Sequence, residues 1–152
     1  MDNFNYAGFG TRLLAHIIDT ILLVVVNFLL GIGLGIGLSL ACLSVGMDSS
    51  IMKTLSSLMG GVLGIVISWL YYALMESSVE QATLGKKLMH IKVTDVEGQR
   101  LTFARATGRH FSKWISNCTI LIGYVMAAFT ERHQALHDII AQTLVLKNPE
   151  QA

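Results

Sequence analysis

Two long uncharged stretches dominate the pattern of hydrophobic and polar positions along the chain. They cover residues 20–47 and 54–75. A helix of about 20 apolar residues is long enough to cross the ~30 Å hydrocarbon core of a bilayer. We therefore predict two membrane-spanning helices, over about residues 13–46 and 54–75.

A third uncharged stretch, residues 114–130, is near the lower length limit for a span and contains several polar residues. Arg105, Arg109 and Lys113 precede it at every fourth position, on one face of a helix. That basic face could bind anionic lipid head groups. The favoured interpretation is that it is solvated and only fixes the orientation of the helix. We predict a third span over about residues 105–130; a re-entrant or interfacial segment fits the same pattern.

The sizeable polar segment, residues 77–102, lies between the second and third predicted spans. Residues 90–94 alternate between polar and apolar, Glu97-Gly98 supplies a turn, and residues 99–103 alternate again. Residues 143–146 are typical of another short strand or of an apolar tail. The predicted fold is an all-α membrane protein with about three transmembrane helices and a small cytoplasmic β-hairpin between the second and third.

Composition agrees with a membrane protein and excludes several other classes. Of 152 residues, 53% are hydrophobic and 14% charged, against ~25% charged in ordinary soluble domains, and the net charge is +1. A soluble globule, a disordered chain and a nucleic-acid binder driven by bulk charge are all disfavoured. Cys42 and Cys118 lie in apolar runs, so we expect no disulfide. We expect a single domain over residues 1–147, followed by a tail, residues 148–152.

The basic residues predict the orientation in the membrane. The N-terminus and the polar segment share a side if two spans separate them, and they carry most of the lysines and arginines, whereas the loop between the spans offers only Lys53. The N-terminal apolar run is too long for a signal peptide and reads as a retained anchor. We expect a multi-pass protein of the bacterial cytoplasmic (inner) membrane, with its N-terminus and hairpin in the cytoplasm.

One polar stripe lies on the first predicted span. Arg12, His16 and Asp19 share a narrow helical face, and Asn27 extends it. A carboxylate in a span is costly and needs a partner, which we expect to be Arg12. The stripe is either an ion or proton site centred on Asp19 or a structural ion pair that fixes helix register.

A second polar cluster lies near the C-terminus. His133 and His137 are four residues apart, and Asp138 follows directly. As a metal motif the cluster is weak, because it lacks a cysteine or a second carboxylate, and a solvated helix or strand cap is favoured. Asp138 also fits a helix N-cap before the apolar residues 139–141. We expect no metal.

Small residues recur at helical spacing in both long spans. Gly31 and Gly35, in a run that also holds Gly33 and Gly37, and Gly60 and Gly64 favour close helix packing. The first glycine run also fits a helix break, although packing is favoured.

Three segments, YAGFGTRLLAHIID (6–19), ATLGKKLMHIKV (82–93) and QALHDIIAQTLVL (134–146), together resemble the RDD membrane-protein family, named for one arginine and two aspartates. The resemblance puts the arginine at Arg12 and the aspartates at Asp19 and Asp138. It implies that Asp138 returns to the neighbourhood of the other two, through pairing of the C-terminal strand with the hairpin. His90 and Gln142 stand where glycine is common in the family.

The resemblance implies a membrane protein whose activity is unsettled, with transport and cation/proton exchange suggested for some members. The first hypothesis is therefore transport of cations, protons or another small ligand, with Asp19 as the exchangeable carboxylate. Three helices hardly enclose an alternating-access pathway, so this hypothesis requires a homo-oligomer or a partner. The alternative is a non-catalytic membrane subunit or scaffold that binds other membrane proteins. We expect no enzyme, no cofactor and no nucleic acid; the expected partners are the bilayer and a monovalent cation or proton.

Overall fold

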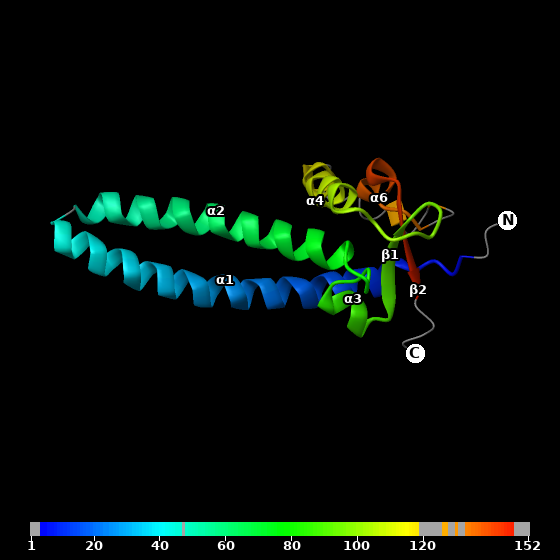
Figure 1. Ribbon diagram of the computed structural model, residues 1–152, viewed down its shortest axis with the longest axis horizontal. Coiled ribbons are helices and arrows are strands. Elements are labelled where there is room, and N and C mark those ends of the chain that lie inside the picture. The colour runs from blue at the N-terminus through cyan, green and yellow to red at the C-terminus, as the bar shows by residue number, and fades with distance from the viewer. Residues whose placement is uncertain (1–3, 47, 119–125, 128–129, 131–132, 148–152) are drawn as a thin grey trace. The chain divides into compact units, whose positions relative to one another are not determined.

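The structure is a computed structural model that describes residues 4–46, 48–118, 126–127, 130 and 133–147. The chain forms two compact units, one of residues 1–19 with 69–152 and the other of residues 20–68. We call them the first and the second unit. The helices α1 (Phe9–Val45) and α2 (Ser49–Glu76) each contribute to both units (Figure 1).

The second unit consists of the apolar stretches of α1 and α2. Among the described residues, α1 with 37 residues and α2 with 28 residues are the two helices long and apolar enough to cross a membrane. Their apolar side chains are uncovered on the outside: Phe28 is 66% exposed and Leu40 is 65% exposed. A soluble core helix would bury such side chains, whereas a helix surrounded by lipid leaves them on its surface.

The glycine run of α1 does not break the helix, because α1 continues through it to Val45. A Cβ atom placed on Gly31, Gly35 or Gly60 would meet no described atom within 4 Å. A Cβ on Gly64 would lie 3.2 Å from Oδ1 of Asn27, so this glycine permits a close approach. Close packing is therefore observed at Gly64; the other three glycines leave their faces uncovered by the described residues.

A two-stranded antiparallel sheet organises the first unit. β1 (Ile91–Asp95) pairs with β2 (Thr143–Lys147), with Val93 opposite Val145. The residues before α1 run along the other edge of β2, where the Ala7 amide donates to the Val145 carbonyl at 2.9 Å. Ile91, Val93 and Val145 are buried, and they pack with small residues such as Ala7 and Ala15. The sheet thus ties both ends of the described chain together.

The predicted hairpin, in which residues 90–94 pair with residues 99–103, is wrong in its second strand. A turn follows β1 as expected, since the Asp95 amide donates to the Gln99 carbonyl at 3.0 Å, but residues 99–103 form no strand. The partner of β1 is β2, about 50 residues further along the chain. Residues 143–147 are apolar and largely buried, so they complete the core better than residues 99–103 could. The expected return of the C-terminal strand to this region is confirmed.

Within its described residues, the first unit also contains α3 (Leu84–Leu88), α4 (Phe103–Cys118) and α6 (Leu136–Ala141). The N-cap of α3 is Thr83, whose hydroxyl accepts from the Lys86 amide. α4 packs against α6, and the Trp69 indole at the end of α2 donates to the Thr107 hydroxyl of α4 at 3.1 Å.

α4 is amphipathic, but its polar face is buried and its apolar face is exposed. It buries polar side chains, including Arg109, Ser112 and Ser116, and exposes the large apolar side chains of Trp114 and Ile115. A helix surrounded by water does the opposite. The basic face predicted to be solvated therefore faces protein at Arg109, because buried carboxylates neutralise the charge there.

The predicted third span over residues 105–130 is described at residues 105–118, 126–127 and 130; residues 119–125 and 128–129 lie outside the described part of the chain. Pairing of β1 with β2 requires both strands to lie on the same side of a membrane. Of the described helices, α1 and α2 are the ones long and apolar enough to cross a membrane, so a third crossing within residues 105–130 stays a prediction.

Candidate functional site

Asp138 is the centre of a chain of buried ion pairs. It is fully buried at the third position of α6, where it accepts from the Ala135 amide at 3.2 Å; it is not the N-cap. Arg12 Nη1 lies 2.6 Å from Asp138 Oδ2, and Arg109 Nη2 lies 2.6 Å from Asp138 Oδ1. The predicted pairing of Arg12 with Asp19 is therefore wrong. Arg12 points instead toward the end of β2, where it also donates to the Val145 carbonyl.

Arg109 extends the chain of charges to Glu76 at the end of α2. Its Nη1 lies 2.7 Å from Glu76 Oε1, and the same carboxylate oxygen is 2.5 Å from Lys86 Nζ of α3. Positive and negative groups thus alternate through the protein interior. We call this set the charge network; its members are Arg12, Asp138, Arg109, Glu76 and Lys86.

Asp19 is buried outside this network and is held by neutral donors. It accepts from the Tyr71 hydroxyl at 2.8 Å, the Thr83 hydroxyl at 2.6 Å and the Gly85 amide at 2.8 Å. A Cβ on Gly85 would overlap the Ala15 carbonyl oxygen and lie 2.9 Å from the Asp19 carboxylate. Asp19 therefore anchors the start of α3 against α1, and the approach requires glycine.

Lys113 carries a further charge beside the network. Its Nζ lies 3.7 Å from the centre of the Tyr72 ring. Among the described residues, its nearest carboxylate oxygen is Glu76 Oε1 at 3.9 Å, and that oxygen already receives Lys86 and Arg109. Burial lowers the pKa of Lys113 to about 7; the attraction of Glu76 opposes this shift, and the nearby Arg109 and Lys86 add to it.

The network stabilises the charges of Asp138 and Arg109, whereas burial lowers the pKa of Lys86 against the opposing attraction of Glu76. Burial alone would raise the pKa of Asp138, but Arg109, His137 and Arg12 outweigh it and hold that pKa well below its ordinary value. Burial opposes the charge of Arg109, yet Glu76 and Asp138 together raise its pKa above the ordinary value. Asp138 and Arg109 stay charged at neutral pH, whereas Lys113 is close to its midpoint.

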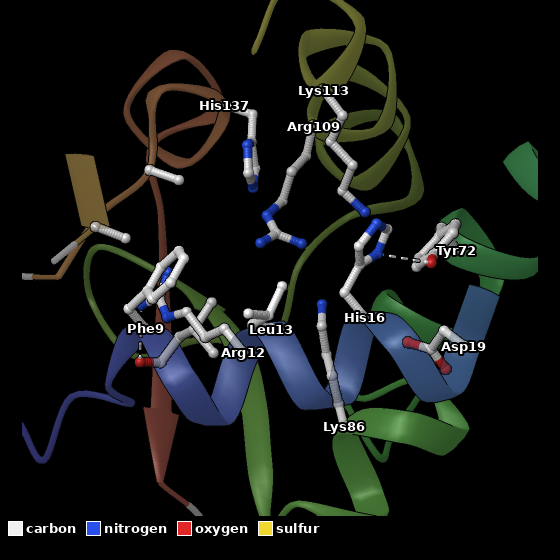
Figure 2. A pocket seen from close by; sticks show the side chains of 13 residues that line it. Phe9, Arg12, Leu13, His16, Asp19, Tyr72, Lys86, Arg109, Lys113 and His137 are labelled. Carbon is white, nitrogen blue, oxygen red and sulfur yellow. Dashed lines mark hydrogen bonds between the residues drawn. The ribbon is translucent and has the colours of Figure 1, made fainter. Parts of the chain in front are cut away.

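A cavity of about 370 Å³ lies between these elements (Figure 2). In Figure 2, Arg109 and Lys113 from α4, His137 from α6 and Lys86 from α3 approach the face of α1 that carries Arg12 and His16. Among the described residues of its wall, Asp19 carries the one carboxylate; Glu76 and Asp138 are not part of the lining. The cationic residues of the wall are Arg12, Lys86, Arg109 and Lys113.

The shared helical face of Arg12, His16 and Asp19 is confirmed, since all three line this cavity. The His16 Nδ1 atom lies 3.4 Å from the Tyr72 hydroxyl. Asn27 belongs to the second unit, where its amide donates to the Leu23 carbonyl at 2.8 Å.

His133 and His137 contact different groups. His133 Nδ1 lies 3.0 Å from the Ala127 carbonyl, and His137 Nδ1 lies 3.3 Å from the Ser116 hydroxyl. Burial lowers the pKa of His137 to about 3, although Asp138 opposes the shift. The described residues contain no group of three or more histidine, cysteine, aspartate or glutamate side chains able to hold a metal ion.

Glu76 and Lys86 are the functional candidates that sequence reasoning missed. In the sequence, Glu76 directly follows the second predicted span, and Lys86 is one of the basic residues of the polar segment that predict the orientation. The sequence contains one indication of such partners. Arg105, Arg109 and Lys113 share a helical face, and if that face is buried, it requires carboxylates from elsewhere in the chain.

Comparison with known proteins places this site in a family. The model of the RDD family matches residues 6–142, a range that includes Arg12, Asp19 and Asp138. Two proteins of Bacillus subtilis strain 168 are similar over nearly the whole chain. The uncharacterized protein YxaI is 34% identical over 92% of this chain and 96% of its own length. The uncharacterized membrane protein YteJ is 33% identical over 93% of this chain and 80% of its own length.

No solved structure matches the chain. The family match spans the first two motifs and the third as far as residue 142, and the structure brings the arginine and the second aspartate into direct contact at 2.6 Å. With its two long apolar helices, the chain belongs to the RDD family and is a membrane protein.

Proposed function

We propose that the protein is a small membrane transporter that couples proton movement to the passage of a small ligand, with Lys113 as the group that exchanges the proton. The observation that carries this proposal is the position of Lys113. Its side chain, which is 12% exposed, lies beside a cavity, and its nearest described carboxylate is 3.9 Å away and already shared by two other cations.

This proposal moves the exchange step from Asp19 to Lys113. Three donors occupy Asp19, and its carboxylate holds α3 against α1. Release of that carboxylate would disturb the local fold, because Gly85 and Thr83 would lose their acceptor. The printed contacts of the Lys113 ammonium are with the Tyr72 ring at 3.7 Å and Glu76 at 3.9 Å, so gain or loss of its proton leaves the backbone hydrogen bonds of the described residues intact.

The surroundings support a place at the membrane boundary. α4 exposes Trp114 and Ile115, side chains suited to the interface between lipid and water. We propose that the first unit lies on the cytoplasmic side of the bacterial inner membrane, since it carries nearly all the basic residues and the second unit holds only Lys53.

A single copy is too small for an alternating-access pathway, so the proposal includes a homo-oligomer. The faces of Gly31, Gly35 and Gly60 carry no described neighbour within 4 Å of a Cβ position and suit close packing against another copy.

The test is proton flux in proteoliposomes loaded with a pH-sensitive dye. Lys113→Met removes the exchangeable amine and should abolish ligand-dependent flux, whereas Lys53→Met, on an exposed position of α2, should leave it unchanged. Equal flux in Lys113→Met and the unaltered protein would refute the assignment. Absence of flux in a correctly folded protein would instead favour the membrane-subunit alternative. Asp19→Asn tests the earlier hypothesis separately, through its effect on folding as well as flux.

A further inference from the structure

The nature of the ligand follows from the charges that the cavity leaves unmatched, and this inference rests on the proposed function. A cation site needs oxygen ligands that are free to coordinate. The buried carboxylates of Asp138 and Glu76 each receive at least two cationic donors. Asp19 receives three neutral donors. The described carboxylates of the site are therefore either paired with cations or held by hydrogen-bond donors, which disfavours a metal cation.

The cationic side chains, in contrast, face the cavity. Arg12, Lys86, Arg109 and Lys113 form part of its wall, and the carboxylates of the network are not part of the lining. Of these four, Lys113 has the longest contact with a carboxylate, at 3.9 Å, and donates no hydrogen bond within the described part of the chain. Its remaining N–H groups are available to an acceptor in the cavity.

The compensation of the Lys113 ammonium by described groups comes from the Tyr72 ring at 3.7 Å and from Glu76 at 3.9 Å. Two changes can relieve its charge further: it loses its proton, or it gains an anion. The pKa of about 7 makes both accessible near neutral pH. Cationic groups near Lys113 favour its neutral amine, and anionic groups favour its ammonium. The titratable groups that face it come from every neighbouring element: Arg12, His16 and Asp19 of α1, Tyr72 and Glu76 of α2, Lys86 of α3, Arg109 and His110 of α4, and His137 and Asp138 of α6.

We propose that the cavity binds a small oxyanion, a carboxylate or a phosphate-type group, against Lys113, and that binding is accompanied by uptake of one proton on the lysine amine. The volume of about 370 Å³ is at the small end of the range for ligand sites, so it fits a compact anion or a single lipid head group. Both sources present the same negatively charged oxygens.

The proton uptake gives the proposal a specific signature. Sulfate and acetate are suitable probes, and titration calorimetry in buffers of different ionisation enthalpy counts the protons taken up per anion. Because Lys113 is mostly neutral at pH 8 and mostly protonated at pH 6, uptake should approach one proton at pH 8 and fall toward zero at pH 6.

Two variants of Lys113 distinguish the effect of its positive charge from the effect of its proton exchange. Lys113→Arg should bind the probes at both pH values without proton uptake, because a guanidinium stays charged. Lys113→Met should weaken binding by at least about tenfold, the loss expected for one hydrogen bond to a charged group. Lys53→Met should match the unaltered protein. Equal affinity in Lys113→Met, or persistent uptake in Lys113→Arg, would overturn the proposal.

The source of the anion is resolved by the membrane around the protein. In phosphatidylcholine nanodiscs, sulfate binding supports a free anion; its loss in phosphatidylglycerol nanodiscs supports a head group in the same cavity. Absence of binding in detergent and in both kinds of nanodisc overturns the inference. Flux that depends on Lys113 without any anion binding would overturn this inference alone, whereas anion binding without flux would overturn the proposed transport.

Discussion

Substitution of Glu76 by glutamine is the sharpest perturbation of the charge network. Glutamine keeps the shape of the side chain but removes the negative charge that faces Lys86 at 2.5 Å and Arg109 at 2.7 Å. Arg109 keeps Asp138 as a partner, whereas Lys86 has no second carboxylate within 4.0 Å among the described residues. Removal of one partner from a buried pair costs about 3–5 kcal/mol. We expect Glu76→Gln to lower the free energy of unfolding by this amount.

Denaturant unfolding in detergent, followed by tryptophan fluorescence, measures the effect. Both tryptophans of the chain, Trp69 and Trp114, belong to the first unit and report on it. The matched control is Glu80→Gln, which removes a carboxylate that is 48% exposed and lies 3.0 Å from Lys87. An exposed pair contributes about 0–1 kcal/mol.

A loss in Glu76→Gln no greater than in Glu80→Gln would refute the buried network. A second substitution gives an independent check, because Lys86→Met removes the charge that Glu76→Gln leaves unpaired. Combined, the two changes should cost less than the sum of their separate effects, by at least about 1 kcal/mol. A strictly additive result would contradict direct contact between these side chains.

Three further substitutions test other parts of the site. Gly85→Ala should lower the melting temperature, with a cost of about 1–3 kcal/mol from overpacking against α1, and an unchanged temperature would contradict the close approach. Gln142 has a left-handed backbone with φ of 52°, so Gln142→Gly should raise the free energy of unfolding by about 1 kcal/mol; a decrease would contradict that conformation. In double-mutant cycles, Arg12 and Asp138 should couple by at least about 1.5 kcal/mol and Arg12 and Asp19 by less than about 0.5 kcal/mol; the reverse order would favour the helical-face pairing.

Local features were predictable from the sequence. Uncharged length alone predicted α1 and α2, because lipid imposes a minimum apolar length on a spanning helix. Helical periodicity placed Arg12, His16 and Asp19 on one face, and all three line the cavity. The family motifs indicated glycine-like positions at His90 and Gln142, and both have a φ of 52°.

Long-range pairings were not predictable in the same way. A helical wheel describes neighbours within one helix, so it favoured Asp19 as the partner of Arg12, whereas the true partner is 126 residues away in sequence. Strand alternation similarly indicated β1 but not β2 as its partner. The buried polar face of α4 was hidden for the same reason, since burial of Arg109 depends on carboxylates supplied by α2 and α6.

The central claim is that Lys113 exchanges its proton near neutral pH. Nuclear magnetic resonance of protein labelled with nitrogen-15 lysine measures this directly, with Lys113→Arg used to assign the signal. The account predicts a titration midpoint at about pH 7, with the ammonium present below and the neutral amine above. A midpoint near 10.5, the ordinary value for lysine, would contradict it.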